Sequence, residues 1–219
     1  MNALIFGATG MVGGEALRLC VDNPEIASVV SVGRRPSGIE HARLKEIQHA
    51  NFKDYSALRS HIEKADFVLW CIGVYTGSVS EDKFFEITCG YLEPLVQAIE
   101  EVNPTLTFCL FSASGADPSE QSRMVFARAK GRAERMLQAS KIKDHYIFRP
   151  GYIYPNSGNG PASFMYRISP FFYRLFPGIG IDAIDLARVM IEAGINGLPE
   201  RLYENSHMRA LSVDLQPVS

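Results

Sequence analysis

Three glycines, at positions 7, 10 and 13, directly follow a short apolar run at residues 2–6. Such a run predicts a strand, and the apolar residues at helical spacing within 10–21 predict a helix. A glycine turn between the two lets backbone N–H groups approach a pyrophosphate, which the helix dipole attracts. The segment therefore predicts a dinucleotide-binding turn made of Gly7, Ala8, Thr9, Gly10, Met11, Val12 and Gly13. The alternative is a glycine turn that serves only the packing of helix on strand.

Two arginines, Arg34 and Arg35, follow the next predicted strand, at the place where an NAD site usually carries an acidic residue. An acidic side chain there accepts hydrogen bonds from the ribose 2′-OH, whereas guanidinium groups donate to a 2′-phosphate. The pair therefore predicts NADP in preference to NAD. A solvated pair of loop charges is the alternative.

Two further places are candidates for contacts with the dinucleotide. Asp54 follows a weak, polar strand, and it is either an acceptor for the adenine amino group or the N-cap of the helix that follows. Cys71, Ile72 and Gly73 close an apolar strand, where a small turn would line a ribose. Packing alone explains these three residues equally well.

The rest of the chain supplies the sheet that would bring these residues together. Apolar runs and helical spacings alternate, which predicts strands at 2–6, 27–32, 44–49, 67–72, 105–111 and 145–148, and helices at 10–21, 55–64, 81–102, 120–141 and 182–193. Alternation of this kind is typical of an α/β fold with a doubly wound, mostly parallel sheet. Pro94 predicts a kink or a new helix start within its segment, and a short strand is expected after Leu202.

Residues 151–181 differ from the rest of the chain. Turn residues come first, and a run of aromatic residues with Arg167 and Arg174 follows. We expect one domain over 1–219, with 151–181 as a small, loop-rich appendage on the substrate side. Packing on the sheet is the first interpretation of the aromatic run, and a lid, a partner groove or a membrane contact are the alternatives.

Composition restricts the classes of protein. Of the 219 residues 47% are hydrophobic and 21% charged, with a formal net charge of -2, so a packed core is expected and a nucleic-acid partner is not. No leader or membrane span is recognised, and we expect a cytoplasmic protein. Four single cysteines predict buried, reduced thiols, and the histidines lack the spacing of metal ligands, so no metal site is expected.

Three later motifs follow the glycine turn and Gly33-Arg34-Arg35 in a fixed order: Phe111-Ser112-Ala113-Ser114, Lys130-Gly131 and Arg149-Pro150-Gly151. In this order the chain resembles the atypical short-chain dehydrogenase/reductase superfamily of NAD(P)-binding Rossmann-fold proteins, and most closely its small Tat-interactive-protein-like branch. The resemblance covers nearly the whole chain. It implies that Ser112, Lys130, Arg149, Pro150 and Gly151 adjoin the cofactor.

The resemblance also implies catalytic roles. In this superfamily a serine orients the substrate carbonyl, and a tyrosine four residues before a lysine protonates the developing alkoxide. Lys130 is present and would hold the nicotinamide ribose, but Phe126 stands where the tyrosine is expected. Ser112 and Ser114 are both candidates for the serine, with Ser112 preferred.

A replacement for the missing phenol could come from Tyr75, Tyr152 or Tyr154, which lie on loops after strands, although each is more typical of a packed aromatic. Two classes of function therefore stay open. The first is an NADP-dependent oxidoreductase of a small carbonyl substrate, and the second is a non-catalytic NADPH sensor or scaffold for a regulatory protein partner. An NAD-dependent epimerase or dehydratase is a weaker third, and a homodimer is possible.

Overall fold

The computed structural model describes residues 1–154 and 180–215. Its main sheet has seven strands in the order β3-β2-β1-β4-β5-β6-β9, and each neighbouring pair is parallel. The strands are β1 (Asn2–Phe6), β2 (Ser28–Gly33), β3 (Leu44–Gln48), β4 (Phe67–Trp70), β5 (Thr107–Phe111), β6 (His145–Arg149) and β9 (Leu202–Glu204). The predicted α/β fold with a parallel sheet is confirmed.

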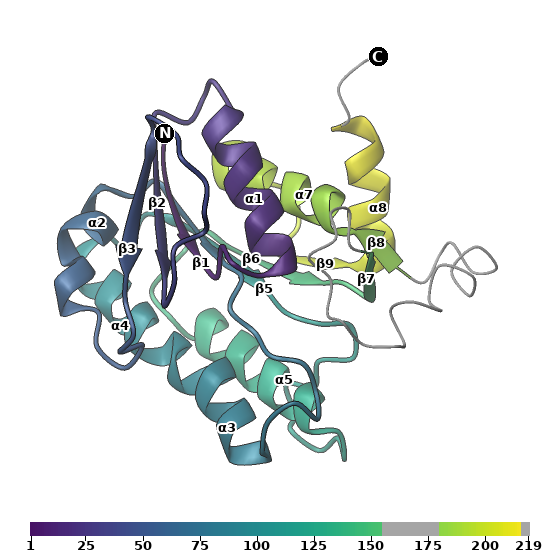
Figure 1. Ribbon diagram of the computed structural model, residues 1–219. Helices are drawn as coiled ribbons and strands as arrows, with labels where there is room; N and C mark the ends of the chain where they lie inside the picture. The colour runs from purple at the N-terminus through teal and green to yellow at the C-terminus, as the bar shows by residue number, and fades with distance from the viewer. Residues whose placement is uncertain (155–179, 216–219) are drawn as a thin grey trace.

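Helices cover both faces of this sheet (Figure 1). One face carries α1 (Met11–Asp22), α7 (Ala183–Asn196) and α8 (Asn205–Asp214). The other carries α2 (Arg59–Lys64), which follows a short 3-10 turn (Ser56–Leu58), together with α4 (Leu92–Val102) and α5 (Val125–Gln138). The doubly wound arrangement follows from parallel strands, because each crossover helix must cover one face.

The central strands are apolar throughout because both of their faces are buried. In β4, Phe67 and Leu69 pack in the cluster under α1 and α7, whereas Val68 and Trp70 pack in the cluster under α2, α4 and α5. All four side chains are at most 1% exposed. Side chains of a strand alternate between its faces, so a continuous apolar run is what a strand between two helical layers requires.

The strand order reverses between β1 and β4. From β1 the chain runs outward through β2 to β3, and it then returns to the other side of β1 to begin β4. In open parallel sheets, ligands bind in the crevice outside the carboxyl ends of the strands at such a reversal. The glycine turn after β1 and the segment after β4 therefore lie where a ligand site is expected.

The two long helices predicted at 81–102 and 120–141 differ most from their predicted bounds. The helix expected over 120–141 is α5, and it begins only at Val125 because Glu120 has a φ of 58°, which a right-handed helix does not allow. The helix expected over 81–102 is broken before Pro94. It consists of α3 (Glu81–Phe85), a π-helical turn (Glu86–Gly90) and α4, and Pro94 lies in the first turn of α4, where a missing N–H costs little.

Three elements were not expected from the sequence. A separate two-stranded parallel sheet pairs β7 (Tyr152–Tyr154) with β8 (Gly180–Asp182), and α8 follows the expected strand β9. The two short strands join the ends of the segment interpreted as an appendage. Residues 155–179, which carry its aromatic run, lie outside the described residues.

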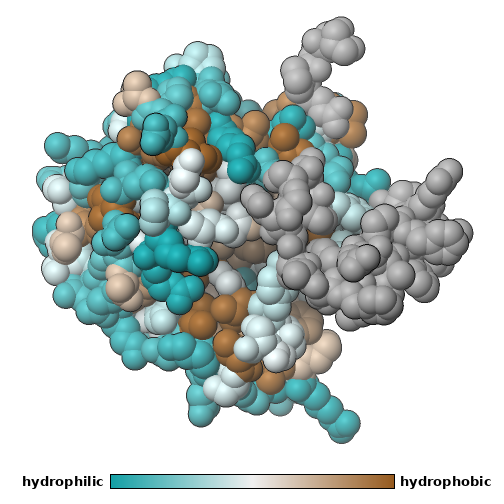
Figure 2. Space-filling view, in the orientation of Figure 1, coloured by the Kyte–Doolittle hydropathy of each residue, from teal (hydrophilic) through white to brown (hydrophobic). Residues whose placement is uncertain are grey.

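The four cysteines, Cys20, Cys71, Cys89 and Cys109, are buried as expected, and none is in a disulfide. Within 1–154 and 180–215, no helix has the length and apolar character needed to cross a membrane. In the space-filling view, apolar surface interrupts the hydrophilic surface around α3 and α5 (Figure 2). Exposed large apolar side chains of the described residues include Tyr75 and Met124.

Candidate functional site

The glycine turn is folded tightly against the segment that follows β4. Gly7 has a φ of 85°, and a Cβ at this position would lie 2.8 Å from the backbone carbonyl of Cys71. At Gly13 a Cβ would lie 2.3 Å from the carbonyl oxygen of Gly7. Neither distance allows a side chain. Two of the three glycines are therefore required by the fold of the turn itself.

Gly10 is different. A Cβ there would lie 3.2 Å from the Gly7 carbonyl oxygen, which is a tight contact and not an overlap. Gly10 is also the N-cap of α1, and no side chain caps this helix. Across the described part of the chain, the backbone N–H groups of Met11, Val12 and Gly13 make no hydrogen bond, and the first bond of the helix is from Gly14 to Gly10. These free donors at a positive helix end fit a pyrophosphate.

A cavity of about 380 Å³ opens directly beside this helix end. Its walls come from the turn and from the carboxyl ends of β4, β5 and β6, and α5 forms its side. The lining residues are Gly10, Met11, Val12, Cys71, Gly73, Val74, Tyr75, Thr76, Phe84, Phe111, Ser112, Ala113, Phe126, Lys130, Gly151, Tyr152 and Ile153. Residues predicted from five separate segments of the sequence thus meet at one cavity.

Lys130 projects from α5 toward the carboxyl ends of β4 and β5. Its Nζ donates a hydrogen bond of 2.9 Å to the carbonyl oxygen of Phe111 and lies 5.1 Å from the centre of the Phe111 ring. A Cβ on Gly73 would lie 4.0 Å from Nζ. Withdrawal of the ammonium from water lowers the pKa of Lys130 to about 8, although the carboxylate of Glu134 partly opposes this shift.

Ser112 lies at the end of β5 and is 2% exposed. Its Oγ donates a hydrogen bond of 2.5 Å to Oε1 of Glu134, which is fully buried on α5 one turn after Lys130. Arg149 donates to both oxygens of the same carboxylate, from Nε at 2.9 Å and from Nη2 at 2.5 Å. Because the carboxylate holds the hydroxyl proton, Ser112 can only accept a hydrogen bond from a group in the cavity.

Arg149 was predicted to adjoin the cofactor, but its guanidinium forms ion pairs with two carboxylates of the chain. Besides Glu134 it binds Glu204 at the end of β9 through Nη1, at 3.0 Å. The hydrogen bond to Glu134 raises the pKa of Arg149, so the guanidinium stays charged. Arg149 therefore joins β6, α5 and β9. Its neighbour Pro150 accepts a hydrogen bond of 2.8 Å from the backbone N–H of Ser114, and of this motif only Gly151 lines the cavity.

Phe126 lines the cavity with its ring and supplies no hydroxyl there. Of the tyrosines considered as substitutes, Tyr75 and Tyr152 line the cavity, and Tyr154 does not. Tyr75 is 53% exposed and belongs to the rim. The described wall around Lys130 is therefore mainly apolar.

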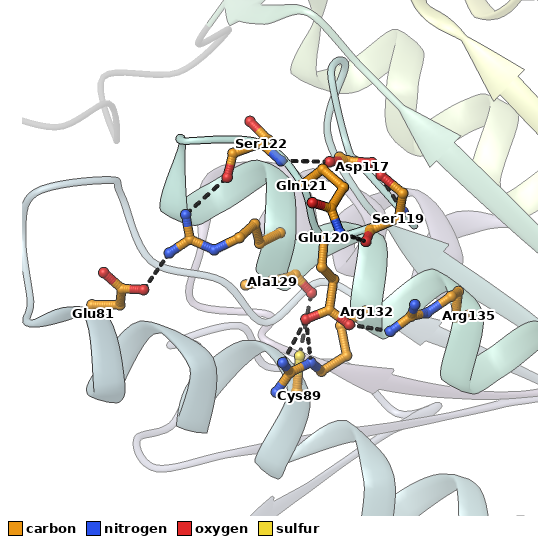
Figure 3. Close-up of polar contacts among 11 residues, drawn as sticks. Glu81, Cys89, Asp117, Ser119, Glu120, Gln121, Ser122, Ala129, Arg132 and Arg135 are labelled. Atoms are coloured by element: carbon orange, nitrogen blue, oxygen red, sulfur yellow. Dashed lines mark hydrogen bonds and ion pairs between the residues drawn. The ribbon is translucent and has the colours of Figure 1, made fainter.

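The loop between Ser112, at the end of β5, and α5 is held by hydrogen bonds within the loop and by ion pairs to α5 (Figure 3). Within this loop, Oδ1 of Asp117 accepts a hydrogen bond of 2.9 Å from the backbone N–H of Ser119, and Oδ2 accepts one of 2.7 Å from that of Ser122. Glu120 pairs with Arg132 at 2.5 Å and also with Arg135. These contacts hold the loop between β5 and α5 against α5, at the residue with the left-handed backbone.

The residues predicted for the adenosine half of the dinucleotide lie elsewhere. Arg34 and Arg35 are exposed after β2, and no other residue of the described chain forms a hydrogen bond or ion pair with either guanidinium. Asp54 does not line the cavity. Its carboxylate accepts a hydrogen bond of 2.9 Å from the N–H of Ser56, which lowers its pKa, so it organises the turn before α2. Asp54 is therefore a turn residue and not the N-cap, because the N-cap of the 3-10 helix that follows is Tyr55.

Glu134 and Glu204 were missed by the sequence reasoning. Glu134 lies on the buried face of α5, between Gly131 and Leu137, where an apolar residue is usual. A carboxylate at such a position signals a buried cationic partner. That signal could have identified Glu134, but it could not have identified Arg149 as the partner.

Comparison with known proteins agrees with this geometry. Residues 7–194 match the model of a family described as NAD(P)H-binding. The chain belongs to this family. Among curated relatives of the chain, the mitochondrial protein Fmp52 of Aspergillus clavatus is 25% identical over 209 residues, covering 90% of this chain and 88% of the relative. The mitochondrial Fmp52 of Saccharomyces cerevisiae is 27% identical over 165 residues, covering 74% and 70%.

Solved structures show the same fold. The Bordetella bronchiseptica enzyme WbmH, in complex with NAD+, superposes with a TM-score of 0.68 at 18% identity, covering 97% of this chain and 79% of that one. A short-chain dehydrogenase/reductase of Saccharomyces cerevisiae superposes with a TM-score of 0.67 at 12% identity, covering 99% of both chains. The resemblance to NAD(P)-binding short-chain dehydrogenases/reductases is confirmed.

One expectation is overturned by the curated relatives of this chain. The absence of a recognised leader suggested a cytoplasmic protein, but the curated relatives are named mitochondrial. The prediction of a cytoplasmic location was therefore wrong. It rested on a signal that was not found at the start of the sequence, and such an absence does not determine a compartment.

Gly13 and Gly10 of the turn provide a matched test. Gly13→Ala is expected to destabilise the fold by about 1–3 kcal/mol or more, because its Cβ overlaps the Gly7 carbonyl. Gly10→Ala is expected to cost less stability and to weaken dinucleotide binding, because its methyl group stands at the helix end. Urea unfolding and a binding titration measure the two effects. Equal stability losses in both variants would contradict this division.

The low pKa of Lys130 predicts a pH dependence of stability. Its folded-state pKa of about 8 is below the ordinary 10.5, so between these values the unfolded chain binds more protons and stability rises with pH. The free energy of unfolding of the wild type, minus that of Lys130→Met, should rise from pH 8 to pH 10 by at most about 1.4 kcal/mol per pH unit. Urea titrations at several pH values measure it, and a flat difference would contradict the shift.

Proposed function

We propose that this protein binds NADP(H) and catalyses hydride transfer between the cofactor and a small carbonyl compound. The observation that carries the proposal is the shared cavity. The free N–H groups at the start of α1, the buried end of β5 and the amine of Lys130 all border the same space of about 380 Å³. A volume of this size suits a reacting ring and a small substrate side by side.

NADP is proposed over NAD because of the charges after β2. Arg34 and Arg35 are exposed and have no described partner, so their guanidinium groups are available to a 2′-phosphate. No described acidic side chain pairs with them in competition. When bound, the nicotinamide supplies or accepts the hydride.

Residues of the chain would bind the cofactor and the substrate and exclude water. The free N–H groups of Met11 and Val12 would hold the pyrophosphate, and Lys130 would donate a hydrogen bond to the nicotinamide ribose. Ser112 would accept a hydrogen bond from a hydroxyl or amide group of the ligand. Val74, Phe111 and Phe126 would keep water from the reacting atoms, because they make the described wall largely apolar.

A second function is favoured by two specific observations. Phe126 provides no phenol in the cavity, and the proton of Ser112 is held by Glu134. A chain with these features could bind NADPH without turnover and report its presence to a partner protein. The nucleotide-sugar epimerases and related enzymes among the structural neighbours are at most 18% identical, and they support the fold alone.

The cofactor preference can be tested by calorimetric titration with NADPH and NADH. The wild type is expected to bind NADPH at least about tenfold more tightly, since a charge-assisted contact contributes about 1.5–3 kcal/mol. Replacing both Arg34 and Arg35 with Ala should remove this preference and leave NADH binding unchanged. Arg123→Ala, at another exposed arginine, is the matched control. Equal binding of both cofactors by the wild type would contradict the NADP assignment.

Turnover separates the two functions. Oxidation of NADPH in the presence of small aldehydes and ketones supports the reductase, whereas tight binding without oxidation of NADPH supports the sensor. Phe126→Tyr restores a phenol on the same helix face as Lys130. If the chain is a sensor derived from an enzyme, this variant should gain turnover. If it is a reductase with its own proton donor, the variant should gain nothing or lose activity.

A further inference from the structure

The described wall of the cavity offers few groups that could transfer a proton. Its polar side chains are those of Cys71, Tyr75, Thr76, Ser112, Lys130 and Tyr152. Burial raises the pKa of the Cys71 thiol to about 12, and the proton of Ser112 is already donated to Glu134. A threonine hydroxyl is too weak an acid to take part. Three side chains remain: the amine of Lys130 and the phenols of Tyr75 and Tyr152.

Position distinguishes these three. Tyr75 is more than half exposed on the rim, and Tyr152 belongs to the separate two-stranded sheet. The Nζ of Lys130 instead lies between Gly73 after β4 and the carbonyl of Phe111, the residue next to Ser112. This is the crevice at the carboxyl ends of the central strands, where the reacting atoms of a bound ligand are expected.

We propose that Lys130 is the catalytic acid and base of this cavity, and that its Nζ exchanges the proton directly with the oxygen of the substrate. The proposal rests on the reductase function given above. During reduction a hydride from NADPH forms the new C–H bond, and the C=O π electrons move to oxygen. The oxygen then takes a proton from Nζ, which becomes a neutral amine and recovers a proton from water. The sum is carbonyl, NADPH and a proton giving alcohol and NADP+.

The surroundings of Nζ suit this exchange. The ammonium has three N–H groups, of which one is held by the Phe111 carbonyl, so after the loss of a proton the amine stays in place. The groups that influence its charge come from every side: Glu134 on α5, Cys89 on the π-helical turn and Cys71 after β4. The only carboxylate among them, that of Glu134, is paired with Arg149 at 2.5 Å.

The first test needs no substrate. In protein labelled with ¹³C at lysine Cε, the resonance that disappears in Lys130→Arg belongs to Lys130, and its shift is followed against pH. We expect a midpoint near 8 for Lys130. The resonance of the exposed Lys143, assigned with Lys143→Arg, is followed in the same spectra for comparison. A Lys130 midpoint above pH 10 would overturn the proposal, because the amine could not then release and regain a proton near neutrality.

The second test uses para-nitrobenzaldehyde and diacetyl as probes in single turnovers with NADPH. The wild-type rate should fall about tenfold per pH unit above the Lys130 midpoint, because only the ammonium donates. Lys130→Arg keeps a positive charge but does not deprotonate in this range. Its rate should be at least about 100-fold lower than that of the wild type, and the fall in rate at high pH, here called the pH limb, should be absent. Lys130→Met is the second variant, and NADPH fluorescence confirms that each variant binds the cofactor. Lys143→Arg is the control for the exposed surface.

The outcomes separate this proposal from the function on which it rests. Turnover that persists in Lys130→Arg with its pH limb intact would overturn the role of Lys130 and leave the reductase standing. If the pH limb disappears in Tyr152→Phe and not in Lys130→Arg, the phenol of Tyr152 is the proton donor. Tight NADPH binding by the wild type without oxidation of NADPH by either probe would overturn both the reductase and the role of Lys130.

Discussion

The buried carboxylate of Glu134 constrains this structure more than any other single group. A charge with no exposure is tolerated only when partners replace the lost water, and Arg149 and Ser112 do so with three hydrogen bonds. These partners stand at the ends of β6 and β5, so the ion pair fixes the rotation and height of α5 relative to the sheet. Lys130 lies four residues earlier on the same helix face. Its place in the cavity therefore follows from the anchoring of Glu134.

The same contact sets the chemistry of Ser112. A serine hydroxyl normally both donates and accepts, but here its one proton is directed to a carboxylate that is also paired with Arg149. The hydroxyl is left as an acceptor for whatever enters the cavity. The family resemblance suggests the reverse, a serine that donates to a carbonyl oxygen. This chain keeps the serine. Its hydroxyl is an acceptor toward a ligand, however, because Glu134 on α5 takes its proton in a hydrogen bond.

The sequence predicts best what depends on neighbouring residues. The turn of Gly7 and Gly13 and the apolar strands follow from local spacing, whereas the family resemblance pointed to Lys130. The structure has the tight glycine turn, and Lys130 lines the cavity beside it. Contacts between distant segments were beyond such reasoning. The Arg149-Pro150-Gly151 motif identified the right end of β6, but nothing local shows that the guanidinium turns to Glu134 and Glu204. Likewise, the late start of α5 depends on Glu120 being held by Arg132 and Arg135, which follow it by more than a helical turn.

Phe126 connects these observations. A tyrosine at this place would bring a polar group beside the lysine, and Phe126 leaves apolar surface there instead. An ammonium near apolar surface loses hydration, and this loss is the main reason that the pKa of Lys130 falls to about 8. Phe126 therefore fits the role proposed for Lys130, because it is one of the apolar side chains that line the cavity from which Lys130 would donate its proton.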